Sequence, residues 1–336
     1  MISDKLLVIS DGMRGCGWRL MVACCLMTLA GGCSLDYGLQ ECPYNVRFTF
    51  VPVDGRGVAT GDYPIDSLRM FVYDAEHVLM GEYPGDTCHT GIATLNLPPG
   101  EYTLVAWGNA DDETSLLEHI TPTESRLEEG TLKPHVYSGV PSMREGSGSF
   151  AMECRCTGRL YYGTAAFTAY DYGVAEYSIG MMHAHARLNL TVEWTDEVPA
   201  GVRSAREPLM WLKGVSTGYR FTGGETWGDY CFPCHAPEGT GAYRTAATLT
   251  TGYKIKGSFT TLRLRDEDHP VVTVTDGSAG LMRDIDLSRY FTVMGIGLSR
   301  NIRQEFDLTI RISRDQTLIM QTNLSGWEEG GMIGTN

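Results

Sequence analysis

The fold of this chain is decided by the run MHAHARLNLTVEW at residues 182–194. Apolar side chains occupy every even position of the run, and polar side chains occupy the odd positions between them. A repeat of two residues is typical of a β-strand with one buried face. At about 3.3 Å per residue, a straight strand of this length would extend roughly 40 Å. We therefore predict that the run bends or serves two domains.

Upstream, the segment ATLNLPPGEYTLVAWGN at residues 93–109 carries a turn signal between two apolar stretches. Pro99 presets the backbone φ angle for a turn, and Gly100 is conformationally permissive. We predict a β-hairpin with its turn at these two residues. Apolar residues on both sides of the second strand indicate that both of its faces are covered, as in a sandwich. Trp107 and Trp194 are predicted to be core residues.

Other short apolar or alternating segments recur along the chain between turn residues, which predicts antiparallel β-sandwiches. Leucine and isoleucine spacing over 112–120 predicts one short helix in the first half. The fold class that we predict is all-β with few short helices. Predicted strands cover 44–50, 68–73, 78–80, 150–154, 159–162, 209–213, 219–222, 246–251, 259–264, 271–275 and 306–312.

An export signal precedes this β-rich part. Residues 20–29 form an uncharged apolar run behind Arg14 and Arg19, and small residues lead into Cys33 in the sequence Leu29-Ala30-Gly31-Gly32-Cys33. A basic region, an apolar region and a small-residue site describe a cleavable signal peptide. The run is shorter than the roughly 20 residues that span a bilayer. A plain secretory signal and an internal apolar segment are the weaker alternatives.

The signal resembles those of bacterial lipoprotein precursors. In such precursors the cysteine thiol takes a diacylglycerol, the preceding peptide bond is cut, and the freed amine is acylated. We therefore expect a signal peptide over 1–32, covalent lipid on Cys33 and a tether over 33–42. Two or more acyl chains give stable membrane anchoring, whereas one is marginal. Asp4 and Asp11 suit a signal peptide poorly, so we expect translation to start at Met13.

The mature chain of 304 residues has the length of about two domains, which we place at 43–176 and 177–336. Removing residues 1–32 takes away three basic and two acidic side chains, so the net charge falls from −14 to −15. A chain this acidic is repelled by nucleic acid and by anionic lipid surfaces. We expect no nucleic-acid partner.

Six cysteines besides Cys33 remain after cleavage: Cys42, Cys88, Cys154, Cys156, Cys231 and Cys234. Export permits their oxidation, and their even number permits three disulfides. The sequence leaves the pairing open. An anaerobic habitat would leave some of them reduced.

Several of these features occur together in one known family. The lipobox, the Cys42-Pro43 pair before the first strand, the 93–109 segment, Arg187-Leu188 in the long strand and a late Leu324-Ser325-Gly326-Trp327 follow in order. In these residues the chain resembles the FimB-type fimbrial anchor lipoproteins of Bacteroidales, relatives of the type V pilus subunits.

That resemblance implies two transthyretin-like β-sandwich domains. It also implies an outer-membrane, surface-exposed lipoprotein that tethers a pilus shaft and influences its length, with successive subunits joined by β-strand addition. Which shaft subunit binds, and whether the chain is an anchor, a tip or another accessory subunit, stay open. Residues 204–253 match no part of the family pattern.

Two groups of residues suggest other chemistry. Cys231-Phe232-Pro233-Cys234-His235 has the spacing of covalent haem attachment, but it lies in a β-rich segment and not in a small helical domain, so thiols or a disulfide in a loop are the better interpretation. His183 and His185 point the same way from one strand, as a two-histidine metal site requires. Arg187 beside them opposes a cation, and we predict that they lie on a polar face without metal.

Acidic residues cluster at 111–113 and 266–268, where oxygen ligands could hold calcium. Neither cluster has the spacing of a known calcium loop, so we interpret both as solvated turns. No nucleophile elbow, zinc-binding helix or phosphate loop is present in the sequence. We therefore predict no enzyme activity, no catalytic residues, no metal and no cofactor apart from the lipid on Cys33.

Two rival functions are weighed against the fimbrial anchor. A surface carbohydrate-binding lipoprotein would show an exposed aromatic platform at one sandwich edge. A secreted hydrolase would show paired carboxylates or a catalytic triad in a cleft. The carbohydrate binder is the stronger alternative.

Overall fold

The computed structural model describes the chain from Pro43 to Asn323 with gaps. The described residues are 43–53, 58–60, 64–85, 91–136, 152–155, 157–194, 210–228, 230–233, 244–245, 253–275, 282–299, 304–312 and 317–323. Strands dominate them, so the prediction of an all-β fold is confirmed. None of the helices among these residues has the length and apolar character needed to cross a bilayer.

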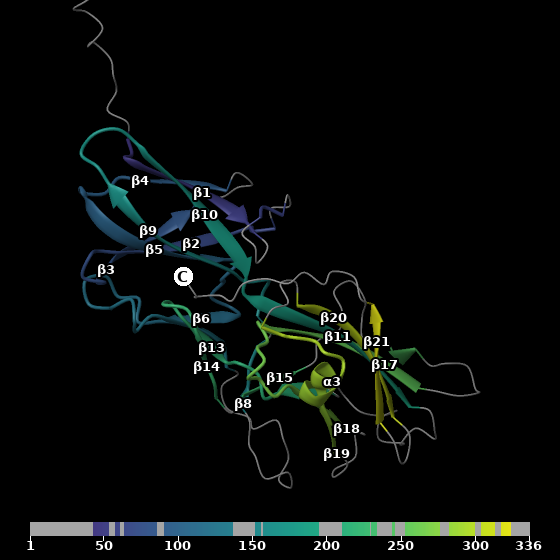
Figure 1. The fold of residues 1–336 in the computed structure, drawn as a ribbon. Coiled ribbons are helices and arrows are strands. Elements are labelled where there is room, and N and C mark those ends of the chain that lie inside the picture. Colours follow the sequence, from purple (N-terminus) through teal and green to yellow (C-terminus); the bar gives the residue numbers. More distant parts are fainter. Residues whose placement is uncertain are drawn as a thin grey trace, which may run out of the picture. The chain divides into compact units, whose positions relative to one another are not determined.

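The first sheet has seven strands in the order β3-β2-β5-β9-β10-β1-β4 (Figure 1). Most neighbours run antiparallel, but β1 and β10 are parallel. The strands are β1 (Val46–Pro52), β2 (Leu68–Tyr73), β3 (Leu79–Gly85), β4 (Ile92–Leu95), β5 (Gly100–Gly108), β9 (Tyr161–Ala169) and β10 (Ala175–His183).

The seven-stranded sheet is folded on itself between β9 and β10. These two strands share only two residue pairs, Met182 with Tyr162 and His183 with Tyr161. Gly163 lies beside this join, where a Cβ atom would come within 2.9 Å of the Gly180 carbonyl oxygen. Away from the join, β9 pairs with β5 and β10 pairs with β1. The two parts of the sheet enclose an inner core with members on each side: Val46, Phe48, Phe50, Leu104, Phe167 and Ile179.

The predicted hairpin over residues 93–109 is wrong. Both strands form, but β4 pairs with β1, and β5 pairs with β2 and β9. Pro98 and Pro99 lack the N–H groups that a hairpin ladder needs. The connection therefore crosses from one side of the inner core to the other. The prediction that both faces of β5 are covered is confirmed, because Leu104 lies in the inner core while Val105 and Trp107 lie in another.

A second pair of sheets encloses the large core. One has the order β16-β17-β11-β20-β21 and the other β19-β18-β12-β15-β8. Their strands are β8 (Met152–Glu153), β11 (His185–Trp194), β12 (Met210–Lys213), β15 (Tyr230–Pro233), β16 (Arg244–Thr245), β17 (Tyr253–Leu262), β18 (Val271–Thr275), β19 (Met282–Asp286), β20 (Glu305–Ile312) and β21 (Thr317–Asn323). The large core includes Leu188, Leu190, Val192 and Trp194 of β11 with Phe306 and Ile310 of β20.

Helix α3 (Leu287–Val293) covers part of the large core with Leu287 and Phe291. Its N-terminus is capped by Asp286, whose side chain accepts the Arg289 N–H. Such a cap satisfies one of the backbone donors that the first turn of a helix leaves without a partner. The helix therefore starts where β19 ends.

A four-stranded sheet, β14-β13-β7-β6, covers the outer face of β2, β5 and β9. It consists of β6 (Ser115–Glu118), β7 (Thr131–Pro134), β13 (Gly218–Arg220) and β14 (Glu225–Thr226). Together they bury the shared core, which holds Phe71, Val105, Trp107, Leu132, Tyr162, Tyr219, Phe221 and Leu262. Residues from both halves of the sequence therefore pack into one core.

The helix predicted over 112–120 is also wrong. The Asp111 side chain accepts the N–H groups of Glu113 and Thr114, which closes a single turn. Beyond that turn the chain pairs with β7 as strand β6. Leu117 packs against the shared core while Leu116 is exposed, so burial alternates as it does in a strand. Packing against β7 outweighs the helical spacing of the leucines.

The long run at 182–194 is divided between two sheets. Residues up to His183 belong to β10 in the first sheet, and residues from His185 belong to β11 in the second. The change of sheet comes at Ala184, whereas the predicted domain boundary at 176/177 falls inside β10. β13, from the second predicted domain, pairs with β7 from the first. The division into two transthyretin-like domains stays a prediction.

Candidate functional site

The predicted lipid-attachment residue Cys33 lies outside the described residues, as do the signal peptide and the tether. Pro43 is the first described residue, and Asn45 is the first residue with hydrogen bonds to the sheet. Twelve peptide bonds separate Asn45 from Cys33. The sheet therefore begins within twelve peptide bonds of the predicted lipid.

Asn45 connects three segments at one end of the seven-stranded sheet. Its side chain donates to the Leu97 and Tyr170 carbonyl oxygens at 2.7 and 3.1 Å and accepts the Leu97 N–H at 3.0 Å. Its backbone bonds to Leu95 and Ala175. We call Asn45 and residues 96–100 and 170–174 the Asn45 end. One side chain thus holds together the start of β1 and the β4–β5 and β9–β10 connections.

Aromatic rings support the Asn45 end from beneath. Tyr102 stacks on Phe167 with ring centroids 5.5 Å apart, and Phe48 meets Phe167 edge-on at 5.0 Å. The Tyr102 hydroxyl donates to the Pro98 carbonyl oxygen, and the Tyr177 hydroxyl bonds both the N–H and the C=O of Thr168. Aromatic pairs of this geometry add stability beyond the area that they bury. The connections at this end are therefore held in place by packed side chains.

Exposed aromatic side chains in the described residues are few. Tyr170 and Tyr172 lie in the β9–β10 connection and are 54% and 91% exposed, and Trp227 is 57% exposed. The Trp227 indole N–H donates to the Asp268 carboxylate at 2.8 Å. Trp107 and Trp194 are buried, which confirms the prediction that both are core residues.

The two histidines of the long run do lie on the same side, with ring centroids 5.0 Å apart. The prediction of a polar face is wrong for His185, which is buried beneath Tyr161 and bonds to the Leu160 carbonyl oxygen through Nδ1 at 2.9 Å. Burial lowers the pKa of His185 to about 4. It is therefore a neutral core side chain at physiological pH.

Metal binding by the histidines gains no support. In the part of the chain that the structure describes, no three histidine, cysteine, aspartate or glutamate side chains gather closely enough to hold an ion. His183 and His185 lie among the rings and backbone where the chain changes sheet. Their proximity is explained by that packing.

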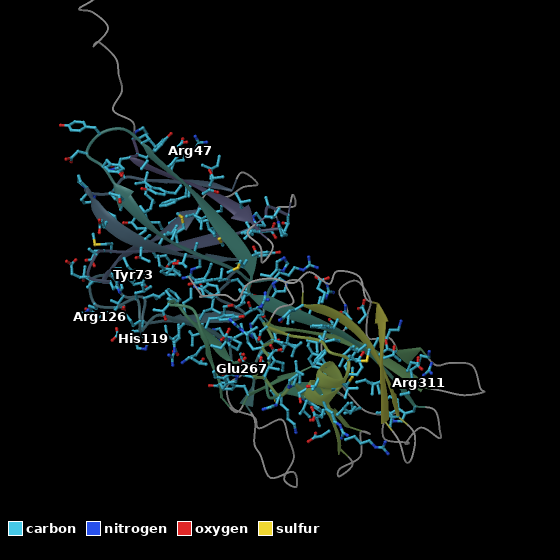
Figure 2. The ribbon with its side chains drawn as sticks, in the orientation of Figure 1. Arg47, Tyr73, His119, Arg126, Glu267 and Arg311 are labelled. Carbon is cyan, nitrogen blue, oxygen red and sulfur yellow. The ribbon has the colours of Figure 1, made fainter. Side chains whose placement is uncertain are left out.

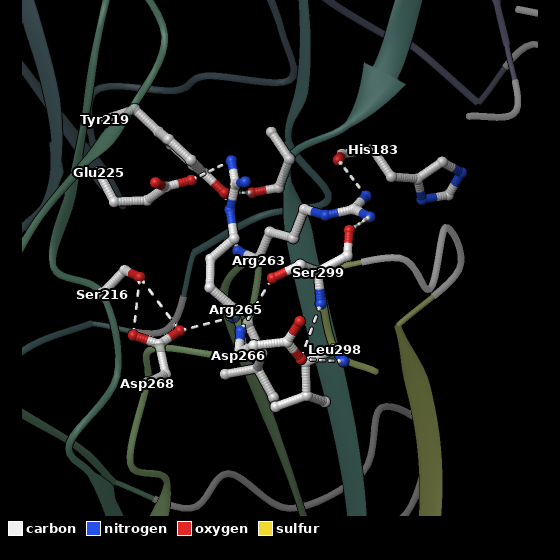
Figure 3. A network of polar contacts seen from close by, with 12 residues as sticks. His183, Ser216, Tyr219, Glu225, Arg263, Arg265, Asp266, Asp268, Leu298 and Ser299 are labelled. Carbon is white, nitrogen blue, oxygen red and sulfur yellow. Dashed lines mark hydrogen bonds and ion pairs between the residues drawn. The ribbon is translucent and has the colours of Figure 1, made fainter. Parts of the chain in front are cut away.

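A buried polar network surrounds Ala184 (Figure 3). The Tyr219 hydroxyl donates to the Ala184 carbonyl oxygen at 3.0 Å and accepts the Arg263 N–H at 2.9 Å. The Arg263 guanidinium donates to the His183 and Ser299 carbonyl oxygens. We call residues 183–185, 216–219, 225 and 263–268 with Ser299 the Ala184 junction. Its bonds connect β10, β11, β13 and the segment after β17.

The acidic cluster at 266–268 belongs to this junction, and its interpretation as a solvated turn is wrong for Asp268. Asp268 is buried and accepts bonds from the Ser216 hydroxyl, the Trp227 indole and the Arg265 N–H. Asp266 accepts the Leu298 N–H at 2.7 Å. Glu267 is exposed at the surface (Figure 2). The cluster at 111–113 forms an exposed turn, as predicted.

Arg265 forms a buried ion pair with Glu225 in the same junction. Burial raises the pKa values of Asp268 and Glu225 and lowers that of Arg263. All of these groups are directed at one another or at backbone atoms of the fold. Paired and buried in this way, they hold the change of sheet together and leave no carboxylate pair in a cleft.

Cys154 and Cys231 are the two cysteines within the described residues, and both are buried. The Cys154 N–H bonds to the Cys231 carbonyl oxygen, yet Cys154 packs in the large core and Cys231 packs against Trp211. Cys42, Cys88, Cys156, Cys234 and His235 lie outside the described residues. Residues 231–233 of the haem motif lie in strand β15, so the interpretation of this part as a loop is wrong. Disulfide pairing stays a matter of sequence alone.

Sheet edges are the other candidate for interaction. Within the described residues, eight strands pair with one neighbour only: β3, β4, β6, β8, β14, β16, β19 and β21. Five of them, β4, β6, β8, β14 and β16, have four residues or fewer. β3 contains Glu82 and Pro84, and β19 contains three charged residues. β21 has seven residues, TLIMQTN, without charge or proline. Short, charged or proline-containing edges resist pairing with another chain, and β21 has none of these protections.

Sequence reasoning missed Asn45, the Glu225–Arg265 pair and the edge of β21. An asparagine before a strand is ordinary in sequence, and its partners lie 52 and 125 residues away. The pair is separated by 40 positions along the chain. Only β21 carried a signal, because an uncharged run of seven residues is visible in the sequence.

A comparison with known protein families shows which family the chain belongs to. The sequence model of the fimbrillin-A associated anchor proteins Mfa1 and Mfa2 matches residues 39–330, which is most of the protein. The chain belongs to this family of fimbrial anchor proteins. The suspected kinship with Bacteroidales fimbrial anchors is thereby confirmed. No curated protein matches the chain in sequence.

Solved structures of similar fold support the assignment of the fold. The fimbrial anchor protein Mfa2 from Porphyromonas gingivalis has a TM-score of 0.59 and 17% identity, covering 86% of this chain and 100% of that one. A protein from Bacteroides ovatus described as a candidate adhesin has a TM-score of 0.59 and 14% identity, covering 87% and 97%. One from Bacteroides thetaiotaomicron described as a candidate polysaccharide binder has a TM-score of 0.58 and 12% identity, covering 84% and 99%.

Family membership places the chain among cell-surface, pilus-associated proteins that associate with fimbrial shaft subunits. The family is one of structural anchors and not of enzymes. Identities below 25% extend the likeness of the solved structures to the fold alone.

Proposed function

We propose that this protein is the lipid-anchored base of a fimbria. Acyl chains on Cys33 hold it in the outer membrane, and an exposed sheet edge holds the first shaft subunit and so influences the length of the shaft. Family membership supports the role of fimbrial anchor. The sequence of residues 29–33 supports the lipid, and the unprotected edge of β21 supports the mode of attachment.

The edge of β21 is the single observation that carries the mode of attachment. An edge strand presents N–H and C=O groups that an extended segment of another chain completes, which gives affinity through main-chain hydrogen bonds. β21 is held by β20 on one side, with Ile319 opposite Ile310. Its other side is the place where a strand from the shaft subunit adds to the sheet.

The position of β21 fits a terminal subunit. β21 and β11 lie in the same sheet. The Asn45 end belongs to the seven-stranded sheet, whose strand β10 ends just before Ala184, where the chain changes sheet. Attachment to the membrane and attachment to the shaft therefore use different sheets. A subunit whose N-terminus is fixed in a bilayer can end a shaft but cannot lie within it.

The lipid is tested by substituting Cys33→Ala. We expect the variant to fold normally and to leave the membrane fraction, because the predicted lipid is on a tether that precedes the first strand. The wild type should incorporate labelled palmitate, and the variant should not. Folding is controlled by comparing urea unfolding of the two proteins. A variant that stays with membranes, beside a wild type that takes up no label, would contradict the lipid anchor.

Strand addition is tested by hydrogen exchange of the purified protein with and without its shaft subunit. We expect every second amide of β21, those facing away from β20, to gain protection in the complex, because added strands bond only to groups on the open side. Amides of β3, the protected edge of the other sheet, serve as the control and should not change. A complex that forms without added protection in β21 would contradict attachment at this edge.

A further inference from the structure

We infer that the Asn45 end of the seven-stranded sheet rests on the lipid headgroups, with Tyr172 and Tyr170 in the interface. This inference rests on the proposed anchoring at Cys33. It assigns the protein a second membrane contact, made by the folded part of the chain.

The first observation is exposure. Tyr172 is 91% exposed and Tyr170 is 54% exposed, although large aromatic side chains are usually buried at least in part. Both lie in the short connection between β9 and β10, with Gly173 at φ +80° allowing the tight turn. Tyrosine has an apolar ring and a polar hydroxyl, a combination enriched at membrane–water interfaces.

The second observation is position. The Tyr170 carbonyl oxygen accepts a bond from the Asn45 side chain at 3.1 Å, so the tyrosine connection is tied to the residue that follows the tether. Eleven residues lie between Cys33 and Asn45, so twelve peptide bonds separate the two. Fully extended, they span no more than about 40 Å. Within that reach the two tyrosines meet the bilayer at a high effective concentration, at which even a weak contact is populated.

The third observation is charge. The mature protein carries a net charge of −15, which opposes contact with a membrane surface in general. The Asn45 end contains 11 residues, and Asp171 is its one charged side chain. Arg47, visible near this end in Figure 2, pairs with Glu176 at 3.2 Å. The end that the tether brings to the membrane is thus almost uncharged.

The fourth observation is support. The connections bearing the tyrosines and Pro98-Pro99 are held by Asn45 and by the rings of Phe48, Tyr102, Phe167 and Tyr177. A surface that is already ordered loses little conformational entropy when it binds. The occupant that this end fits is a lipid surface without net charge, such as phosphatidylcholine or phosphatidylethanolamine headgroups.

The test uses a tryptophan reporter and lipids with brominated acyl chains, which quench indole fluorescence on contact. Tyr172→Trp places the reporter at the Asn45 end. Val293→Trp is the matched control, because Val293 is 77% exposed on α3, in the other pair of sheets. The native tryptophans contribute the same background fluorescence to both variants. The mature lipidated protein is reconstituted in neutral phosphatidylcholine vesicles.

We expect brominated lipid to reduce the added emission of the Tyr172→Trp protein about two-fold, as for a side chain within the headgroup boundary, and to leave that of Val293→Trp unchanged. Equal emission from Tyr172→Trp in brominated and ordinary vesicles would overturn the inference, provided that the protein floats with the vesicles. Quenching of both reporters would also overturn it, because contact would then not be specific to this end.

A second arm separates this inference from the lipid anchor. A hexahistidine sequence in place of Cys33 binds the same chain to vesicles containing nickel-chelating lipid, with the tether length kept. Quenching at residue 172 in this arm supports the contact whether or not cells acylate Cys33. Mass spectrometry of the native protein reports acylation, so its absence would sink the lipid anchor alone. Bound but unquenched protein would sink the membrane contact alone.

Discussion

The seven-stranded sheet and the five-stranded sheet that contains β11 differ in their edge strands. In the first, β3 carries Pro84 and the ion-paired Glu82, and β4 has only four residues. In the second, β21 presents seven uncharged residues. Proteins usually blunt such an edge to avoid aggregation. We propose that this difference reflects two roles, with the first sheet beside the membrane and the second receiving another chain.

The two sheets are nevertheless parts of one folded structure. The shared core places Trp107 of β5 against Tyr162 of β9 and Tyr219 of β13. The Ala184 junction holds β10 to β11 through buried hydrogen bonds. Packed side chains and buried hydrogen bonds therefore connect the sheet that contains β21 with the seven-stranded sheet. The predictions that follow separate the two sheets or test their connection, from the largest expected effect to the smallest.

Trp107→Ala should lower the free energy of unfolding by about 4 kcal/mol, because a large, fully buried ring leaves a cavity. Since the shared core contacts strands of both sheets, circular dichroism and fluorescence should report one transition at a lower urea concentration. Tyr172→Ala, at a position that is 91% exposed, is the control and should cost less than about 1 kcal/mol. Two separate transitions in the Trp107 variant would show that the sheets unfold independently.

Glu225→Gln should cost about 3 kcal/mol, because the buried Arg265 guanidinium loses the carboxylate that it faces. The matched control is Glu176→Gln in the exposed pair with Arg47, where the expected change is below about 1 kcal/mol. Urea unfolding of both variants at pH 7 measures the difference. Equal, small effects would mean that the Ala184 junction does not stabilise the change of sheet.

His185 should make stability fall on acidification. Its pKa is about 4 in the folded protein, below its ordinary value near 6.5, because burial disfavours the charged form. The contribution is fully present above pH 6.5 and is lost as the pH falls toward 4, because only the unfolded chain binds the proton. At pH 5 the loss relative to pH 7 should be about 2 kcal/mol for this residue.

The measurement compares wild type with His185→Gln by urea unfolding at pH 7 and pH 5. The wild type should lose more stability between these values than the variant does. Asp268 and Glu225 have raised pKa values and act in the opposite direction, but they are present in both proteins and cancel. Parallel losses in the two proteins would contradict a neutral, buried His185.

The smallest expected effect on the unfolding free energy concerns β3, the protected edge strand of the seven-stranded sheet. Replacing Glu82→Thr and Pro84→Val in β3 should change the unfolding free energy by less than about 1 kcal/mol, because both side chains are exposed. The same change removes the charge and the proline that protect this edge. Sedimentation should then detect dimers that the wild type lacks. A monomeric variant would show that edge composition does not control pairing in this protein.

Much of the fold was predictable because it follows from local alternation. Alternation over 182–194 predicted strand there, and Leu68–Tyr73 and Val271–Thr275 were predicted to the residue. Pairing partners were not predictable. Residues 93–109 contain a good turn signal, yet β4 pairs with β1, because hydrogen-bond partners are set by packing across the inner core.

The candidate sites also differ in whether local sequence predicts them. Cys33 was predicted from a local motif, which needs no three-dimensional context. The Asn45 end and the Ala184 junction are assembled from positions far apart in sequence, so their members look ordinary one by one. Asp268 was misjudged for this reason. Charged triplets are usually solvated, and its burial depends on Ser216 and Trp227, which lie 52 and 41 positions away.

Our central proposal is that this chain fixes a fimbria to the membrane through Cys33. Electron microscopy of cells carrying the wild type, Cys33→Ala or a deletion tests it directly. We predict attached fimbriae of regular length on the wild type, and detached or misregulated fimbriae for both altered strains. Fimbriae unchanged in attachment, length and number in both strains would contradict the anchor, and would leave a carbohydrate-binding surface lipoprotein as the better account.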